Sequence, residues 1–133
     1  MNMRLVLVDD NSRFLRAARS LLERQGIAVV GVASTSEEAL RRAEELRPDV
    51  LLVDIDLGSE SGFDVARLLT TGGTARVILI STHAEQDFAD LIATSPAVGF
   101  ISKSDLSAGT IHEVLKNRTR SGSLHSDPPE ERP

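Results

Sequence analysis

Short, continuous apolar runs alternate with amphipathic stretches along most of the chain, and this alternation limits the fold more than any other feature. The runs are too continuous for strands with one face in water, and they are typical of parallel strands covered on both faces. The stretches between them have helical periodicity, as in Phe14, Ala18 and Leu22. We expect five strands, each followed by a helix, over residues 5–8, 28–33, 50–53, 77–80 and 98–101.

A repeated strand and helix unit of this kind predicts an α/β fold, in which helices cover both faces of one parallel sheet. The length of 133 residues, of which 41% are apolar, suits a single domain with one sheet. Residues 117–133 contain three Pro, and two Ser flank Gly122. We therefore expect a folded domain over residues 1–116 and a disordered tail or linker over residues 117–133.

Composition excludes several classes of protein. The chain has no cysteine, which excludes disulfides, thiolate metal sites and a cysteine nucleophile. Its net charge of −5 argues against a nucleic-acid surface on this domain. No apolar run approaches the roughly 18 residues of a membrane span, and no signal peptide is recognisable at the N-terminus. We expect a cytoplasmic protein that does not contact membranes.

Polar side chains follow four of the five predicted strands. In an open parallel sheet, ligands bind beyond the carboxyl ends of the strands, so these residues are the candidates for chemistry. Taken singly, each has a simpler explanation: an aspartate or hydroxyl as a turn former or helix cap, a lysine as an exposed surface cation. The candidates are Asp9 and Asp10, then Asp54, then Ser81 and Thr82, and finally Ser102 and Lys103.

Carboxylates brought together at one edge repel one another unless a cation lies among them. With no His or Cys at the strand ends, the ligands are all oxygen, which favours Mg²⁺ or Mn²⁺. Mg²⁺ bound by few carboxylates usually shares a phosphate, so a phosphoryl group is the implied second ligand. Of the 15 Lys and Arg residues only Lys103 and Lys116 are lysine, which suggests that a compact ammonium is required at Lys103.

Four segments together resemble the receiver domain of bacterial two-component response regulators. They are LVLVDDN at residues 5–11, LLVDIDLGSESGFD at 51–64, VILIST at 77–82 and GFISK at 99–103. The resemblance implies a flavodoxin-like (βα)5 fold with strand order 2-1-3-4-5. Ser104 follows the lysine where proline is frequent in the family, a feature shared with receivers that precede LuxR-type DNA-binding domains.

The resemblance also implies the role of each site residue. Asp54 would accept a phosphoryl group from a phosphohistidine and become an aspartyl phosphate. Mg²⁺ would be held by Asp10 directly, by Asp9 partly through water, by Asp54 and by the backbone carbonyl of Asp56. Lys103 would pair with a phosphate oxygen.

The same resemblance implies a switch and a set of partners. Ser81 would bond the phosphoryl group, and Phe100 would rotate into the space vacated, which would change the surface of the fourth helix, fifth strand and fifth helix. Phe100 is equally well explained as an ordinary core aromatic. The phosphoryl donor would be a sensor histidine kinase or a histidine phosphotransfer protein, and phosphorylation could produce a homodimer. Such a domain phosphorylates and dephosphorylates itself and is not a turnover enzyme.

Three other interpretations are weaker. A pseudo-receiver would bind partners without phosphorylation, although every expected site residue is present. A haloacid-dehalogenase-like phosphatase would share Asp54 and Asp56, but its acidic pair follows the lysine, whereas Asp9 and Asp10 precede it. A nucleotide-binding flavodoxin or Rossmann module lacks support, because no glycine-rich loop follows the first strand. The output stays open between a stand-alone receiver and a part of a DNA-binding transcriptional regulator.

Overall fold

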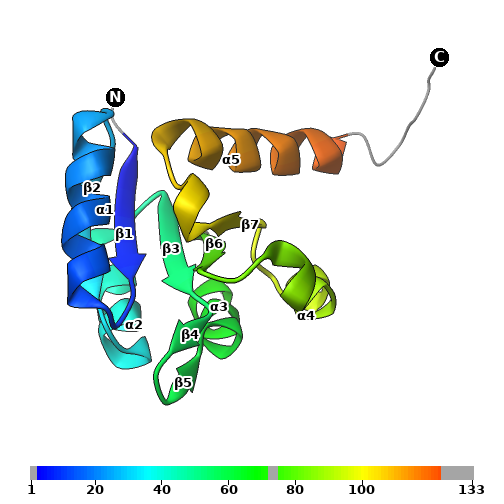
Figure 1. Cartoon of the computed structure of the whole chain (residues 1–133), viewed down its shortest axis with the longest axis horizontal. Helices are drawn as coiled ribbons and strands as arrows, with labels where there is room; N and C mark the ends of the chain where they lie inside the picture. Colours follow the sequence, from blue (N-terminus) through cyan, green and yellow to red (C-terminus); the bar gives the residue numbers. More distant parts are fainter. Residues whose placement is uncertain (1–2, 72–74, 124–133) are drawn as a thin grey trace.

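The computed structural model describes residues 3–71 and 75–123, with side chains as far as residue 117. Over this part of the chain, the main sheet has five parallel strands flanked by helices (Figure 1). Across the sheet, the strands are β2 (Ala28–Ala33), β1 (Arg4–Val8), β3 (Val50–Asp54), β6 (Arg76–Ser81) and β7 (Gly99–Ser102). Counting only these main strands, the order is 2-1-3-4-5, which confirms the predicted flavodoxin-like α/β fold.

The helices are α1 (Ser12–Arg24), α2 (Ser36–Leu46), α3 (Gly62–Thr70), α4 (Ala89–Thr94) and α5 (Ala108–Ser123). Short 3-10 helices precede α4 and α5, namely η1 (Glu85–Phe88) and η2 (Lys103–Asp105). A small antiparallel hairpin of β4 (Asp56–Leu57) and β5 (Glu60–Ser61), which the sequence did not predict, follows β3. In none of the described helices is there a segment long and apolar enough to cross a membrane.

Alternate side chains of each central strand enter opposite hydrophobic clusters, which explains the continuous apolar runs. In β1, Leu5 and Leu7 pack with residues of α1 and α5, whereas Val6 and Val8 pack with residues of α2 and α3. All four side chains are fully buried. Burying them is the main force that fixes the sheet between its helices, at about 1.5–3 kcal/mol for each side chain.

Helix ends follow local signals in the sequence. The Thr35 hydroxyl accepts a hydrogen bond from the backbone N–H of Glu38 and so caps α2. Pro48 stops α2 one residue after Arg47, which takes a left-handed conformation with φ of 47°. Helix α4 has only six residues and ends before Ser95 and Pro96. None of the residues of η1 or α4 is buried, and neither element has a side-chain N-cap.

The last helix continues past residue 116, where we expect the folded domain to end. Helix α5 continues to Ser123, seven residues beyond Lys116. The residues after Lys116 are polar, but polarity alone does not stop a helix, and the first proline of this region is Pro128. The rest of the predicted tail, residues 124–133, lies outside the described residues.

Candidate functional site

Two buried aspartates lie at the carboxyl ends of the neighbouring strands β1 and β3. Asp9 is fully buried and Asp54 is 6% exposed. Asp9 Oδ1 accepts a hydrogen bond of 2.9 Å from the backbone N–H of Asn11, and Asp54 Oδ1 accepts one of 3.2 Å from that of Asp56. Each carboxylate is therefore oriented by the turn that follows its own strand.

Asp10 completes an acidic cluster at the mouth of the site. Its side chain is exposed, and carboxylate oxygens of Asp9, Asp10 and Asp54 all lie within 4.8 Å of one another. Gly58 faces it from the loop after β3: a Cβ atom there would lie 3.0 Å from Asp10 Oδ2. With its φ of 72°, Gly58 also takes a conformation that other residues rarely adopt.

Lys103 reaches the cluster from the end of β7. Its Nζ atom lies 2.7 Å from Asp9 Oδ2 and 3.4 Å from Asp54 Oδ2. Only 13% of the lysine side chain is exposed. The ammonium partly compensates the buried negative charge, as expected for a lysine that serves the site and not the surface.

The pKa of Asp54 is raised to about 6. Burial of the carboxylate is the main cause, and the negative charge of Asp9 adds to it, while the Lys103 ammonium opposes both. Because burial makes the charged form of Asp54 unfavourable, a cation close to this carboxylate stabilises the charged form.

The residues present fit a divalent metal ion. All donors of the cluster are carboxylate oxygens, the set that hard cations such as Mg²⁺ prefer. Asp9 Oδ2 is buried and receives no hydrogen bond from the described residues, only the ion pair with Lys103. This oxygen therefore retains lone pairs for a metal or for a water molecule bound to one. The cluster can bind a metal ion.

The loop after Asp54 is held on two sides. Gly62, at the start of α3, leaves no room for a side chain, because its Cβ atom would lie 2.1 Å from the backbone oxygen of Asp54. Glu60 of the hairpin accepts a 2.8 Å hydrogen bond from the backbone N–H of Ser36 and a second bond from the Ser36 hydroxyl. The hairpin is thereby anchored to the first turn of α2.

Asp56 lies in this loop with its side chain exposed, and its Oδ1 atom accepts a hydrogen bond from the backbone N–H of Gly58. The bond makes a tight turn two residues after Asp54. A role for the Asp56 backbone carbonyl in metal binding stays a prediction.

Ser81 lies at the end of β6 next to the cluster, but its hydroxyl contacts the following loop. Its Oγ atom accepts a 3.0 Å hydrogen bond from the backbone N–H of His83, and His83 Nδ1 lies 3.4 Å away. Among the described residues no hydrogen bond joins Ser81 Oγ to Asp54. Ser81 is the last residue of β6, at the strand end where the sequence predicts it, and its role as a switch stays a prediction.

Phe100 is half-buried on β7, where it packs against the hydrophobic core between the sheet and helices α2 and α3. It also lines a hollow of about 410 Å³ between β7, η1 and α5. The ring thus lies between the core and a surface cavity, which leaves both the core role and the switch role open.

Two residues near the site were missed at the level of sequence. Phe14 was assigned only to the apolar face of α1, yet Lys103 Nζ lies 4.2 Å from its ring centroid. No role is predicted for His83, although it follows Ser81 by two residues, a spacing at which a serine hydroxyl commonly accepts a backbone N–H. That spacing is the only signal that could have identified it.

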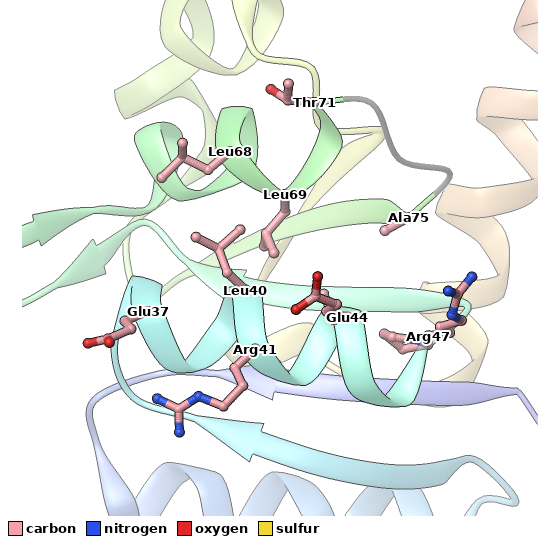
Figure 2. A pocket seen from close by; sticks show the side chains of 11 residues that line it. Glu37, Leu40, Arg41, Glu44, Arg47, Leu68, Leu69, Thr71 and Ala75 are labelled. Atoms are coloured by element: carbon pink, nitrogen blue, oxygen red, sulfur yellow. The ribbon is translucent and has the colours of Figure 1, made fainter.

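A second hollow of about 760 Å³ lies between α2 and α3, away from the acidic cluster. Figure 2 shows Leu40 of α2 and Leu69 of α3 facing each other across it, with Glu37, Arg41 and Glu44 on the α2 side. Leu40 and Leu68 are 38% and 52% exposed. None of the residues that line this hollow belongs to the acidic cluster.

Comparison with known proteins agrees with this geometry. The family model described as "Response regulator receiver domain" matches residues 5–116. The response regulator GacA of Pseudomonas viridiflava is 31% identical over 76% of this chain and 48% of its own length. A protein-glutamate methylesterase/protein-glutamine glutaminase of Thermotoga maritima is 35% identical over 74% of this chain and 30% of its own length. The chain spans less than half of either relative.

Solved structures give the same result. A LuxR-family two-component response regulator from Aurantimonas superposes with a TM-score of 0.78 and 29% identity, over 90% of this chain and 87% of that one. The receiver domain of the response regulator NarL from Mycobacterium tuberculosis gives a TM-score of 0.75 and 28% identity, over 89% of this chain and 97% of that one.

Proposed function

Because this chain belongs to the response regulator receiver domain family, we propose that Asp54 is its phosphoacceptor. The chain is a receiver domain of two-component signalling. The observation that most supports Asp54 is its position: a nearly buried carboxylate at the centre of the sheet edge, with Lys103 Nζ 3.4 Å from its Oδ2 atom and other carboxylates around it. The other two aspartates are less suitable acceptors, because Asp10 is exposed and Asp9 is already paired closely with Lys103.

The donor is a phosphohistidine on a sensor histidine kinase or on a histidine phosphotransfer protein. An Asp54 carboxylate oxygen attacks phosphorus, the N–P bond of the donor breaks, and the imidazole leaves with the electron pair of that bond. The product is an aspartyl phosphate, which water later hydrolyses. This cycle makes the domain a phosphoacceptor and not a turnover enzyme on a separate substrate.

The charged residues around Asp54 have two functions, binding of the phosphoryl group and binding of the metal ion. Lys103 holds a phosphoryl oxygen by its ammonium group, and it is already oriented by Asp9. Asp9, Asp10 and Asp54, with the backbone carbonyl of Asp56, would hold Mg²⁺. When bound, this ion neutralises charge on the transferring phosphoryl group.

The response to phosphorylation is carried by Ser81 and Phe100. The Ser81 hydroxyl turns from His83 to a phosphoryl oxygen, and Phe100 moves inward from the cavity between β7, η1 and α5. The surface formed by α4, β7 and α5 changes as a result. Its weakly buried helix α4 supports this proposal, because elements with few buried contacts rearrange at low cost.

The activity of the whole protein depends on what this surface controls. The similarity to LuxR-family receivers favours control of a DNA-binding domain or partner, and phosphorylation-dependent homodimerisation is the simplest route to it. A stand-alone receiver that acts by protein contact is the alternative.

Labelling by a small acyl phosphate tests the proposed function. We expect stoichiometric, Mg²⁺-dependent phosphorylation of the wild-type protein and none of Asp54→Asn. Asp64→Asn, which changes an exposed aspartate of α3, is the matched control and should be labelled like the wild type. An unlabelled wild-type protein would instead support the pseudo-receiver, which binds partners without phosphorylation.

A further inference from the structure

The hydroxyl of Ser81 is engaged on two sides by His83. Ser81 is 3% exposed, so water has little access to its Oγ atom. The backbone N–H of His83 donates to this oxygen at 3.0 Å, and the Nδ1 atom of the same residue lies 3.4 Å from it. One residue therefore supplies both polar contacts that the structure gives to the hydroxyl.

A serine hydroxyl has a single proton to donate and two lone pairs to accept with. The backbone N–H of His83 occupies one lone pair. When the neutral imidazole carries its proton on Nε2, Nδ1 is an acceptor, and its contact with Oγ uses the only O–H proton of Ser81. A phosphoryl oxygen on Asp54 can only accept, so it needs that same proton.

The imidazole ring of His83 also contacts an aromatic side chain of η1. Its ring meets Phe88 edge to face, with the centroids 5.7 Å apart and the planes at 89°. Phe88 in turn contacts Phe63, which is buried on α3, at a centroid distance of 6.2 Å. This row of aromatic rings connects the exposed His83 side chain to the core and favours a ring position in which Nδ1 lies near Ser81 Oγ.

We propose that His83 is a positioning residue that keeps the Ser81 hydroxyl turned away from Asp54 in the unphosphorylated protein. It does so by competing with the phosphoryl group for the one proton of the hydroxyl. The inference rests on the proposed function of Asp54 and Ser81. Loss of the competing nitrogen frees the proton and makes the phosphoryl-bound state more accessible.

Binding of beryllium fluoride, a stable mimic of a phosphoryl group on a carboxylate, measures this competition in the presence of Mg²⁺. The chain has no Trp or Tyr, so calorimetry is the suitable readout. His83→Phe keeps the ring against Phe88 and removes Nδ1. We expect it to bind beryllium fluoride about two- to ten-fold more tightly than the wild type, the range that one neutral hydrogen bond covers.

Two controls separate competition from a general effect of substitution. His83→Asn restores an acceptor near the position of Nδ1 and should return the affinity towards the wild-type value. His112→Phe changes an exposed histidine of α5 and should leave the affinity unchanged.

A double substitution gives the decisive result. In a Ser81→Ala background the hydroxyl is absent, so adding His83→Phe should change the affinity no further. Equal affinities of the wild type and His83→Phe, or a gain that persists without the hydroxyl, would overturn the inference and leave the proposed function intact. A wild-type protein that neither binds beryllium fluoride nor is labelled would overturn the proposed function itself.

Discussion

The ammonium group of Lys103 lies 4.2 Å from the centroid of the Phe14 ring, so an aromatic side chain of α1 covers one side of this ammonium. The other side of the ammonium contacts Asp9 and Asp54. An aromatic face attracts a cation and also keeps water from it. Phe14 therefore helps to hold Lys103 beside Asp54.

Phe14→Leu should slow phosphorylation of the domain by a small acyl phosphate about two- to ten-fold, the range expected from losing a partly shielded cation–π contact. Phe14→Tyr keeps the aromatic face and should retain the wild-type rate. The measurement is the initial rate of labelling at fixed Mg²⁺. If leucine and tyrosine at this position gave the same rate, the aromatic face would have no part in holding Lys103.

The raised pKa of Asp54 predicts a pH dependence of stability in metal-free buffer. Between its ordinary value of 3.8 and the folded value of about 6, the folded protein binds a proton that the unfolded chain does not. The free energy of unfolding therefore falls as the pH rises through this window, and the buried charge destabilises the fold above it.

Asp54→Asn removes that charge. At neutral pH the variant should be more stable than the wild type by about 1–3 kcal/mol, and the gain should disappear below about pH 4, where the aspartate is protonated in both states. Thermal unfolding followed by circular dichroism with a chelator present measures the difference. A gain that stays constant across the pH range would show that it does not come from the carboxylate charge.

Mg²⁺ should stabilise the wild-type fold, because it binds the clustered carboxylates of the folded state only. At about ten times the dissociation constant the gain is about 1.4 kcal/mol. Asp10→Asn should abolish most of it, while Asp90→Asn, which changes an exposed aspartate of α4, should not. Melting temperatures with and without Mg²⁺ give the answer, and equal shifts in the two variants would argue against the cluster as the binding site.

Gly62→Ala should be among the most damaging small substitutions in the chain. The added Cβ atom would lie 2.1 Å from the backbone oxygen of Asp54, so either α3 or the acceptor strand must move. We expect a loss of about 1–3 kcal/mol in the free energy of unfolding together with slower labelling. Gly109→Ala in α5 meets only an ordinary contact at 3.6 Å and should be neutral or slightly stabilising. Denaturant unfolding compares the two.

The sequence was sufficient for the sheet because each strand is buried on both faces, which leaves an unbroken apolar run. It was also sufficient to predict that Asp9, Asp10, Asp54 and Lys103 lie close together. Parallel strands bring their carboxyl ends to one edge of the sheet, whatever the details of the loops. The hairpin of β4 and β5 has two residues in each strand and no apolar alternation, so no periodicity could reveal it.

The sequence could not predict the direction of individual side chains, for a different reason. Ser81 is at the predicted strand end, but the turn that follows decides whether its hydroxyl faces Asp54 or His83. Phe14 has the same sequence signal whether it fills the core or covers a lysine. The sequence does not indicate the end of α5 either, because the mixed composition of residues 117–133 does not show where helical hydrogen bonding stops.

The hydrogen bonds between Glu60 and Ser36 make the loop after Asp54 rigid on the side of α2. The side of α4 has no comparable anchor among the described residues. The loop is bonded to the first turn of α2, and at the start of α3 it packs against Gly62, where a side chain has no room. Towards α4, the chain runs through helices with no buried residue and no side-chain cap. Strain introduced at Asp54 is relieved by the elements with the fewest buried contacts, so the two sides of Asp54 respond differently. We therefore expect a displacement at Asp54 to pass more easily towards α4 and β7 than towards α2.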